Sequence, residues 1–504
     1  MVSSIVFRGD RPPATLDRQV ARGELRRLVT GVYTTDLTTD LALVVKAEWH
    51  TIVGRLYPDA VITDRSAPTG GAVDGVLYLA HVGRERTTEM PGLTVRARTG
   101  AGPVDGDIKY PDGLWQASKG RALVENTRPS RTRAGRAARA LTATELADWI
   151  DRLAMIDGVE RLKQYREQGE AVASAVGIEA DGVASMATLI GAALGTKSVE
   201  TASAALTARQ SGLPYDGDRM RLFGVLIDAL HDSRPQSRPL GSPTSPRYTR
   251  LPFYEAYFSN FIEGTEFELD EARALVYDGV SIPNRTGDSH DLLGTYTLVA
   301  DLNEMQTLAA DETDFLQLLR RRHGTLMAGR PDKRPGEFKE TANRAGDSSF
   351  VLPGLVAGTL RAGWTRLAEL DTAFERALYM MFLVSEVHPF DDGNGRTARV
   401  MMNAELVSGG QSRIIIPTVY RDDYWGALRR LTRADDPSVL IKALRYAHDY
   451  TSQIPFDSTE RAEAALRLTN AFNPPDSDDR LILPSRLRQL SGPSDDDFGY
   501  TPGR

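Results

Sequence analysis

Residues 388–399 read HPFDDGNGRTAR. This short segment holds a histidine, two adjacent aspartates, an asparagine between two glycines, and two arginines three residues apart. A surface turn uses glycine and asparagine, but it has no need of the histidine or of regularly spaced arginines. The composition of the segment therefore indicates chemistry rather than a simple connection.

The segment lies between two stretches with helical periodicity. Before it, Phe374, Leu378, Met381 and Val384 fall on one face of a helix that becomes apolar nearly all round toward its end. After it, TARVMMNAEL resumes helical character. We therefore expect DDGNG to connect two buried helices, with glycines in left-handed conformations and with the first amides of the second helix directed outward.

Such a connection can bind both an anion and a metal ion. Amides at a helix N-terminus form an anion cradle, and Arg396 and Arg399, one turn apart, can clamp further phosphate oxygens. Asp392 offers the hard oxygen ligand that Mg²⁺ prefers when it bridges a carboxylate to phosphates. His388 can titrate near neutrality and accept a proton from a hydroxyl. Singly, each feature is more often structural, but their combination in one register is rare.

The segment resembles the signature of the Fic family (filamentation induced by cAMP), His-x-Phe-x-Asp/Glu-Gly-Asn-Gly-Arg-x-x-Arg, and every fixed position is present. The resemblance extends over about residues 250–450 and implies a helical protein adenylyltransferase. In such an enzyme a Ser, Thr or Tyr hydroxyl of a target protein attacks the α-phosphate of ATP and pyrophosphate leaves. The resemblance makes His388 the catalytic base and Asp392 the Mg²⁺ ligand. The nucleotide-binding residues that it implies are Gly393, Asn394, Gly395, Arg396 and Arg399.

Two further segments match features of the same family. Residues 335–353, PGEFKETANRAGDSSFVLP, resemble the β-hairpin flap that aligns the backbone of the target, with Lys339 where an arginine is usual. Residues 259–264, SNFIEG, resemble the inhibitory motif Ser/Thr-x-x-x-Glu-Gly/Asn, which assigns a regulatory role to Ser259, Glu263 and Gly264. A carboxylate paired with Arg399 would remove the clamp that the γ-phosphate needs. The bland alternative is that Glu263 is a solvated helix residue.

The whole chain is expected to be a cytoplasmic, mainly α-helical protein of several domains. Its 504 residues carry a formal charge of −7 and no cysteine, which excludes disulfides, thiolate metal sites and a thiol nucleophile. No run is apolar enough to span a bilayer, so we expect no membrane partner. The predicted parts are a mixed α/β region (1–125), a helical region with a basic segment (126–233), a Pro/Ser-rich linker (234–250), a Fic domain with its inhibitory helix and flap (251–453), and a largely disordered acidic tail (454–504).

The front region leaves a second function open. The segments GELRRLVTGVYT (23–34), VITDRSA (61–67) and GLWQASKGRALVENTRPSR (113–131) resemble antitoxins of the AbiEi type, which begin with a winged helix. Five arginines between residues 128 and 139 could bind phosphates, or could belong to a solvated helix face next to acidic residues. The alternative to an enzyme is therefore a DNA-binding or antitoxin-like regulator whose inactive Fic core senses nucleotide. DNA and a second copy of the chain, in a homodimer, stay open as partners.

Overall fold

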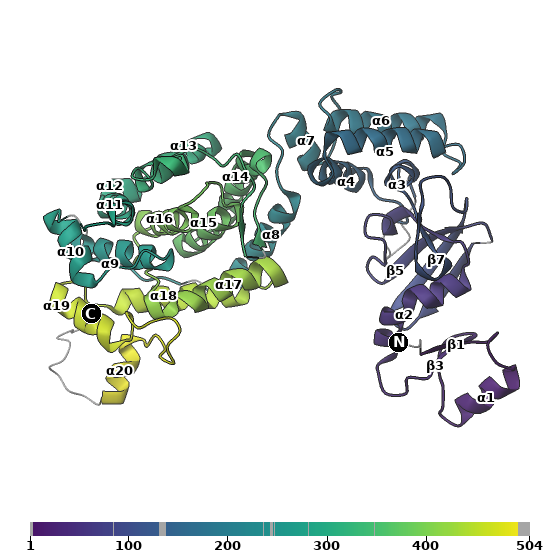
Figure 1. Ribbon diagram of the computed structural model, residues 1–504, viewed down its shortest axis with the longest axis horizontal. Coiled ribbons are helices and arrows are strands. Elements are labelled where there is room, and N and C mark those ends of the chain that lie inside the picture. The colour runs from purple at the N-terminus through teal and green to yellow at the C-terminus, as the bar shows by residue number, and fades with distance from the viewer. Residues whose placement is uncertain are drawn as a thin grey trace. The chain divides into compact units, whose positions relative to one another are not determined.

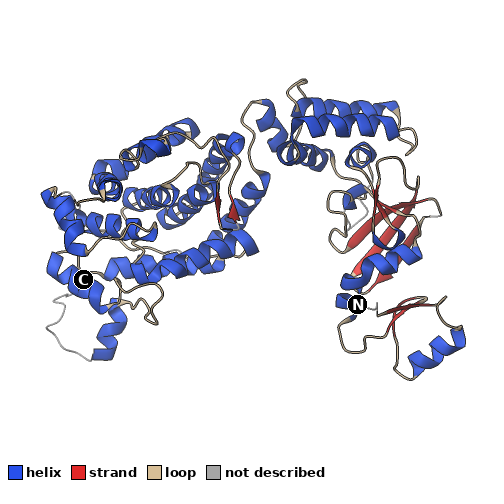
Figure 2. Cartoon of the chain, viewed as in Figure 1, coloured by secondary structure: helices blue, strands red, loops and turns tan. Residues whose placement is uncertain are grey.

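A computed structural model describes most of the chain (Figures 1 and 2). The described residues are 4–83, 85–130, 138–234, 236–241, 245, 247–280, 282–346 and 348–491. The chain forms two compact units, Met1–Gly212 and Leu213–Arg504. Among the described helices, none combines the length and apolar character needed to span a bilayer.

The first unit begins with two sheets. The smaller is antiparallel, in the order β1-β3-β2, and comprises β1 (Ile5–Phe7), β2 (Arg26–Val29) and β3 (Val32–Thr34), with helix α1 (Pro13–Ala21) between its first two strands. The larger is mixed, in the order β6-β7-β5-β4-β9-β8, and comprises β4 (Val61–Ile62), β5 (Val76–His81), β6 (Arg86–Met90), β7 (Leu93–Thr99), β8 (Ile108–Lys109) and β9 (Trp115–Gln116). The predicted mixed α/β character of residues 1–125 is confirmed, whereas the likeness to AbiEi-type antitoxins stays a prediction.

Helices complete the first unit. Helix α2 packs its buried valines and Ile52 against the larger sheet, where Leu77, Leu79 and Val95 are fully buried. The later helices share a second core. The helices are α2 (Leu41–Leu56), α3 (Lys119–Glu125), α4 (Ala143–Ile156), α5 (Gly158–Val172), α6 (Ala180–Ala193) and α7 (Ala204–Gln210).

The basic segment turns partly inward. Arg139 donates from one nitrogen to both carboxylate oxygens of Asp64, at 2.8 Å each, and Asp64 is fully buried. Arg128 donates to the carbonyl of Gly177. Arg139 thus pairs with an acidic neighbour, but that neighbour is buried and neither Arg128 nor Arg139 lies in a helix, so the expected solvated helix face is not found at these two residues. The other three arginines, at positions 131, 133 and 136, lie outside the described residues.

The second unit is helical apart from one hairpin, which Figure 2 shows in red. The hairpin strands are β10 (Arg344–Ala345) and β11 (Ser348–Ser349). The helices are α8 (Gly217–His231), α9 (Arg247–Ile262), α10 (Leu269–Asp278), α11 (Thr286–Ala300), α12 (Leu302–Gln306), α13 (Glu312–Leu326), α14 (Val356–Thr365), α15 (Ala373–Val387), α16 (Asn394–Ser408), α17 (Arg421–Ala434), α18 (Ser438–Gln453), α19 (Thr459–Leu468) and α20 (Pro484–Ser491). The mainly α fold class and the hairpin within residues 335–353 are confirmed.

Helices α15 and α16 are the centre of this unit, with other helices around them (Figure 1). Most residues of both helices are buried, which explains why their sequences are apolar on nearly every face. Thr372 caps α15, and its side chain and that of Glu375 bond reciprocally to the backbone amides at the start of the helix. This capping box fixes the start of α15, and the loop after Val387 joins two buried helices.

The boundary between the units differs from the expected linker at 234–250. The units divide after Gly212, and α8 packs on α14 and α15 within the second unit. Part of the Pro-rich segment is also paired, because Leu240 donates to the Gly410 carbonyl and Ser412 donates to the Arg238 carbonyl. Apolar contacts of α8, including the buried Phe223 against Tyr379 and Phe382, override the composition of the segment that follows.

The structure also differs from the expected disordered tail. Residues 459–491 include α19 and α20, and Phe456, Leu466 and Leu481 are buried in the core of the second unit. The side chain of Phe472 stacks on Phe258 of α9, with ring centroids 5.3 Å apart. A few apolar residues are enough to order this segment, because each one packs against helices of the second unit. Residues 492–504 lie outside the described part of the chain.

The packing of α19 gives a direct test. Leu466 is fully buried and Leu468, on the same helix, is 57% exposed. We expect Leu466→Ala to lower the free energy of unfolding by about 2–5 kcal/mol through lost burial and a residual cavity, and Leu468→Ala to change it by less than about 0.5 kcal/mol. Urea denaturation of the full-length variants measures both. Equal, small effects would contradict the packed arrangement.

Candidate active site

The predicted loop joins α15 to α16, and of its two glycines Gly393 is left-handed as expected, whereas Gly395 already belongs to the helix α16. His388 ends α15 with a left-handed φ of 52°, and Gly393 begins α16 with a left-handed φ of 70°. The Asn394 side chain accepts from the backbone N–H of Phe390 and donates to the Phe390 carbonyl, both at 2.8 Å. Asn394 therefore closes the turn on itself, and Phe390 is fully buried, so its side chain fixes the loop in the core.

His323, on α13, supports the loop from below. Its ring lies parallel to that of Phe390, with centroids 3.6 Å apart. Its Nε2 donates to the Asp392 carbonyl at 3.0 Å, and its Nδ1 accepts from the backbone N–H of Gly336 at 2.9 Å. Sequence reasoning missed this residue, because a histidine 65 positions upstream carries no local sign of the contact.

The flap is tied to the same loop by two polar side chains. Lys339 is buried, and its ammonium donates to Asn343 at 2.6 Å and to the Val387 carbonyl at 3.4 Å. Asn343 donates in turn to the Phe390 carbonyl at 3.0 Å. Burial lowers the pKa of Lys339 to about 8. The lysine that replaces the usual arginine thus takes part in holding the flap against the loop.

The hydrogen bonding of His388 determines which ring nitrogen can accept a proton. Its Nδ1 lies 3.2 Å from the Ser385 carbonyl, which can only accept, so Nδ1 carries the proton and Nε2 is the nitrogen that can take one up. The flap residue Phe350 stacks on the imidazole, with centroids 3.8 Å apart and planes 6° apart. Burial, aided by the charge of Lys339, lowers the pKa of His388 to about 4. The imidazole is therefore neutral at pH 7.

Arg399 is bound by the predicted inhibitory motif. Its Nε donates to the Ser259 hydroxyl at 2.9 Å, and one terminal nitrogen donates to both the Ser259 carbonyl and a Glu263 carboxylate oxygen, at 2.8 Å each. Arg399 is 4% exposed, so these contacts are largely shielded from water. The predicted pairing of Glu263 with Arg399 is observed.

Two glycines make this pairing sterically feasible. Gly264, with a φ of 85°, follows the last residues of α9 and turns the chain away behind Glu263. A Cβ at Gly395 would lie only 2.2 Å from the Glu263 carboxylate and 3.1 Å from Arg399. Position 395 therefore needs glycine for the approach of the carboxylate, in addition to any role in anion binding.

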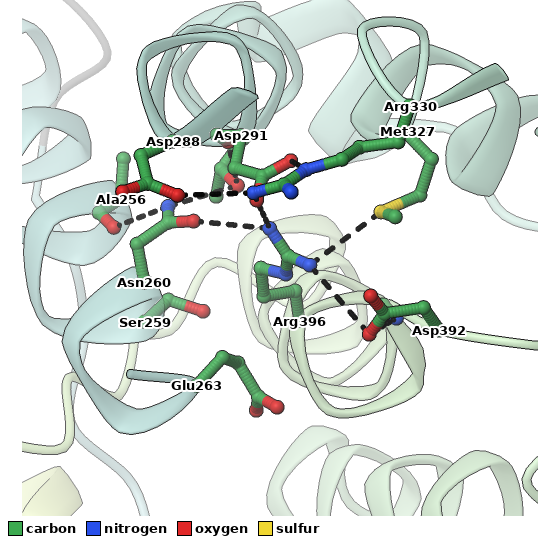
Figure 3. A network of polar contacts seen from close by, with 12 residues as sticks. Ala256, Ser259, Asn260, Glu263, Asp288, Asp291, Met327, Arg330, Asp392 and Arg396 are labelled. Carbon is green, nitrogen blue, oxygen red and sulfur yellow. Dashed lines mark hydrogen bonds and ion pairs between the residues drawn. The ribbon is translucent and has the colours of Figure 1, made fainter. Parts of the chain in front are cut away.

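Arg396 points to the interior on another side of α16 (Figure 3). It is 3% exposed and forms an ion pair with Asp291 at 2.9 Å, and it also donates to Asn260 at 3.3 Å. The same Asp291 oxygen also pairs with Arg330, at 2.7 Å. In this arrangement Arg396 fixes α9 and α11 to the catalytic helix. Its predicted contact with outer phosphates stays a prediction.

A cavity of about 580 Å³ lies beside the loop. His388, Gly395, Arg399 and Glu263 line it together with the flap. Arg396 is not among its described lining residues. Lining residues that sequence reasoning missed are Phe350, Glu386, Tyr424, Trp425, Arg429 and Thr432. The lining residues after position 420 belong to α17. In the sequence they alternate with polar residues, a pattern typical of any amphipathic helix, so nothing marked them as part of a site.

Asp392 fits the requirements of a magnesium ligand that shares its ion with phosphates. Its carboxylate is 46% exposed and accepts from the backbone N–H of Gly393 at 2.7 Å. Within the described ranges, no three His, Cys, Asp or Glu side chains gather into a metal site made of protein alone. A metal here would depend on one carboxylate and on ligand oxygens, as Mg²⁺ often does.

Comparisons with known proteins agree with this geometry. Residues 313–406 match the model of the Fic/DOC family, and they contain the flap, α15, α16 and the loop. This part of the chain is therefore a Fic domain.

Curated relatives include Protein adenylyltransferase fic-1 of Caenorhabditis elegans, 26% identical over 211 residues, or 40% of this chain and 41% of the relative. Protein adenylyltransferase Fic of Nematostella vectensis is 27% identical over 246 residues, or 46% of this chain and 56% of the relative. The chain thus spans about half the length of the curated relatives it matches.

Among solved structures, Fic-1 (aa134–508) from C. elegans aligns with a TM-score of 0.37 and 19% identity, covering 63% of this chain and 99% of that one. That score is too low to carry an argument about this fold.

Buried histidines give the second unit an acid sensitivity. Burial lowers the pKa values of His323, His388 and His448 to about 4 each, whereas a histidine in an unfolded chain titrates near 6.5. The unfolded chain therefore binds more protons between about pH 6.5 and 4, and the free energy of unfolding should fall as the pH decreases through this window. Urea unfolding curves over a pH series measure this slope. His388→Gln should make it shallower, and an unchanged slope would contradict a neutral, buried His388.

Proposed function

We propose that this protein is a protein adenylyltransferase that transfers AMP from ATP to a hydroxyl of a target protein and is inhibited by its own residue Glu263. The observation that carries the proposal is one cavity lined by both a neutral His388 and an arginine, Arg399, beside the N-terminus of α16. A base next to an anion site is the minimum that nucleotidyl transfer requires. The names of the curated relatives support the same activity.

The reaction assigns each group one task. A Ser, Thr or Tyr hydroxyl of the target attacks the α-phosphorus, and the bond from that phosphorus to the bridging oxygen of pyrophosphate breaks. Nε2 of His388 takes up the hydroxyl proton. The amides of Gly393 to Gly395, at the start of α16, stabilise charge on the phosphates, and Arg399 binds the outer phosphate once Glu263 has left it.

Asp392 would hold Mg²⁺ against the phosphates, because its half-exposed carboxylate is adjacent to the same helix N-terminus. Bound there, the ion would neutralise part of the triphosphate charge. The flap hairpin offers an edge to which an extended segment of the target can add as a strand. Its contact with His388 through Phe350 would bring the target hydroxyl to the base.

Inhibition follows from competition for one guanidinium. Arg399 donates to Ser259 and Glu263 of the motif in α9, so the γ-phosphate would meet a donor that is already engaged. The carboxylate of Glu263 would also repel the phosphates. ATP can then bind only in an orientation that does not align the α-phosphate with the attacking hydroxyl.

Release of this contact is testable. In assays with labelled ATP and Mg²⁺, we expect Glu263→Gly to raise labelling of the protein itself or of targets in a lysate by about tenfold or more, since one charge-assisted hydrogen bond is worth 1.5–3 kcal/mol. The double variant Glu263→Gly, His388→Ala should give no label, because the proton acceptor is lost.

The same experiment examines the alternative. A DNA-binding or antitoxin-like regulator with an inactive Fic core would bind ATP yet give no His388-dependent label in the Glu263→Gly variant, and that result would contradict the enzyme. No described contact favours the regulator over the enzyme. A cytoplasmic location, a homodimer and contact with DNA remain predictions, as does removal of AMP with the help of Glu263.

A further inference from the structure

The cavity beside His388 has two chemically different ends. One face of α17 lines it, with Trp425, Leu428, Arg429 and Thr432 at the three- and four-residue spacings that fall on one side of a helix. Tyr424, at the start of this helix, lines the cavity together with Arg399 and Glu263. Thr432 lies eight residues further, about 12 Å along the helix axis.

The far end is marked by a buried carboxylate, Glu386. Its side chain is 5% exposed and lines the cavity. One oxygen, Oε2, accepts from the Thr432 hydroxyl at 2.8 Å. The other, Oε1, lies 3.1 Å from Nε of Arg219 in an ion pair, but it accepts no hydrogen bond from the described residues. Oε1 is itself shielded from solvent. A carboxylate can accept about four hydrogen bonds, so Oε2, beside Thr432, keeps acceptor capacity that its one hydrogen bond from Thr432 does not use.

The positive charge of Arg219 pairs with this carboxylate beside the flap. Arg219, on α8, also donates to the carbonyl of Ser349 at 2.5 Å. Arg433 donates to the hydroxyl of Ser348 at 3.1 Å. The far end of the cavity is thus lined by α15, α17 and the hairpin, and α8 contacts Glu386 and the hairpin through Arg219. A purely structural ion pair would not require that the carboxylate also line the cavity.

The direction of a bound nucleotide follows from the proposed reaction. If the outer phosphate meets Arg399 and the α-phosphate faces His388, the nucleoside must extend past His388 toward Glu386 and Thr432. Trp425 and Leu428 provide apolar surface for a base. The groups of the nucleoside closest to the α-phosphate are on the ribose, whose two hydroxyls are hydrogen-bond donors. Carboxylates are frequent partners of ribose hydroxyls in nucleotide sites.

We propose that Glu386 is a specificity-determining residue whose carboxylate accepts hydrogen bonds from the ribose 2′- and 3′-hydroxyls, so that the site selects ribonucleotides. This inference rests on the proposed function, since the position of the triphosphate sets the position of the sugar. Thr432 orients the carboxylate through its own hydrogen bond. Arg219 forms an ion pair with it from the other oxygen.

Equilibrium binding of three nucleotides tests the assignment. The background is Glu263→Gly with His388→Ala, which releases Arg399 and prevents turnover, and the probes are ATP, 2′-deoxy-ATP and 3′-deoxy-ATP with Mg²⁺ in calorimetric titrations. In this background we expect each deoxy analogue to bind about tenfold more weakly than ATP, the loss expected for one hydrogen bond to a charged group. Adding Glu386→Ala should bring the three affinities within about a factor of two of one another.

Two further variants exclude indirect effects. Glu386→Gln keeps the shape and one acceptor oxygen, and it should reduce the discrimination to about threefold, the loss expected for a neutral acceptor. It also serves if the alanine variant does not fold. Glu405→Gln is the matched control, because Glu405 is likewise buried and faces Arg376 at 3.4 Å, but lies outside this cavity. It should leave the tenfold preference intact.

The binding and labelling experiments give different results if this inference fails and if the proposed function fails. Equal binding of ATP and the deoxy analogues in the background protein, or discrimination that survives both Glu386 substitutions, would overturn the role of Glu386 while leaving adenylyl transfer untouched. Absence of ATP binding, or of His388-dependent label, would instead count against the proposed function. Ribose discrimination that Glu386→Ala abolishes would support the inference even if no target is labelled.

Discussion

Sequestration of Arg399 is the interaction on which the state of this site depends. The Arg399 side chain is buried, and its guanidinium donates hydrogen bonds to Ser259 and Glu263. A buried guanidinium requires such partners, since an unpaired charge in this environment costs several kcal/mol. Either the carboxylate of Glu263 or a phosphate can supply the negative charge. Under the proposed function, the same physical need stabilises the inhibited state and favours the binding of a nucleotide.

A second layer of contacts makes that competition meaningful by fixing the loop around it. Arg396 joins α16 to Asp291, while His323 and Asn343 hold the carbonyls of Asp392 and Phe390. With the loop fixed from three sides, movement of Glu263 is a change of partner for Arg399 rather than a collapse of the site. Catalytic geometry that is set before the substrate arrives is what nucleotidyl transfer needs from a protein.

The inhibitory helix is itself held by segments distant in the chain. Phe472 stacks on Phe258, and Tyr254 lies 5.5 Å, centroid to centroid, from Phe456. Sequence composition suggested that residues beyond 454 would be disordered, yet they cover the outer face of α9. On the other side of the core, α8 supplies Arg219 to the flap and to Glu386. The functional unit is therefore larger than the segment that carries the family signature.

The sequence by itself determined the local features of this protein. The loop between α15 and α16 and the hairpin could be predicted, because each depends on residues at fixed spacing within one segment of the chain. The pairing of Glu263 with Arg399 joins residues 136 positions apart, and it was predicted from the resemblance to the Fic family and not from a local pattern. The tertiary structure decided what distant elements bring together. It placed Arg396 against Asp291, assigned α8 to the second unit, packed α19 into the core and brought Glu386 and Thr432 to one end of the cavity. These contacts join residues tens to hundreds of positions apart, and such pairing is set by how whole helices pack, which no local pattern records.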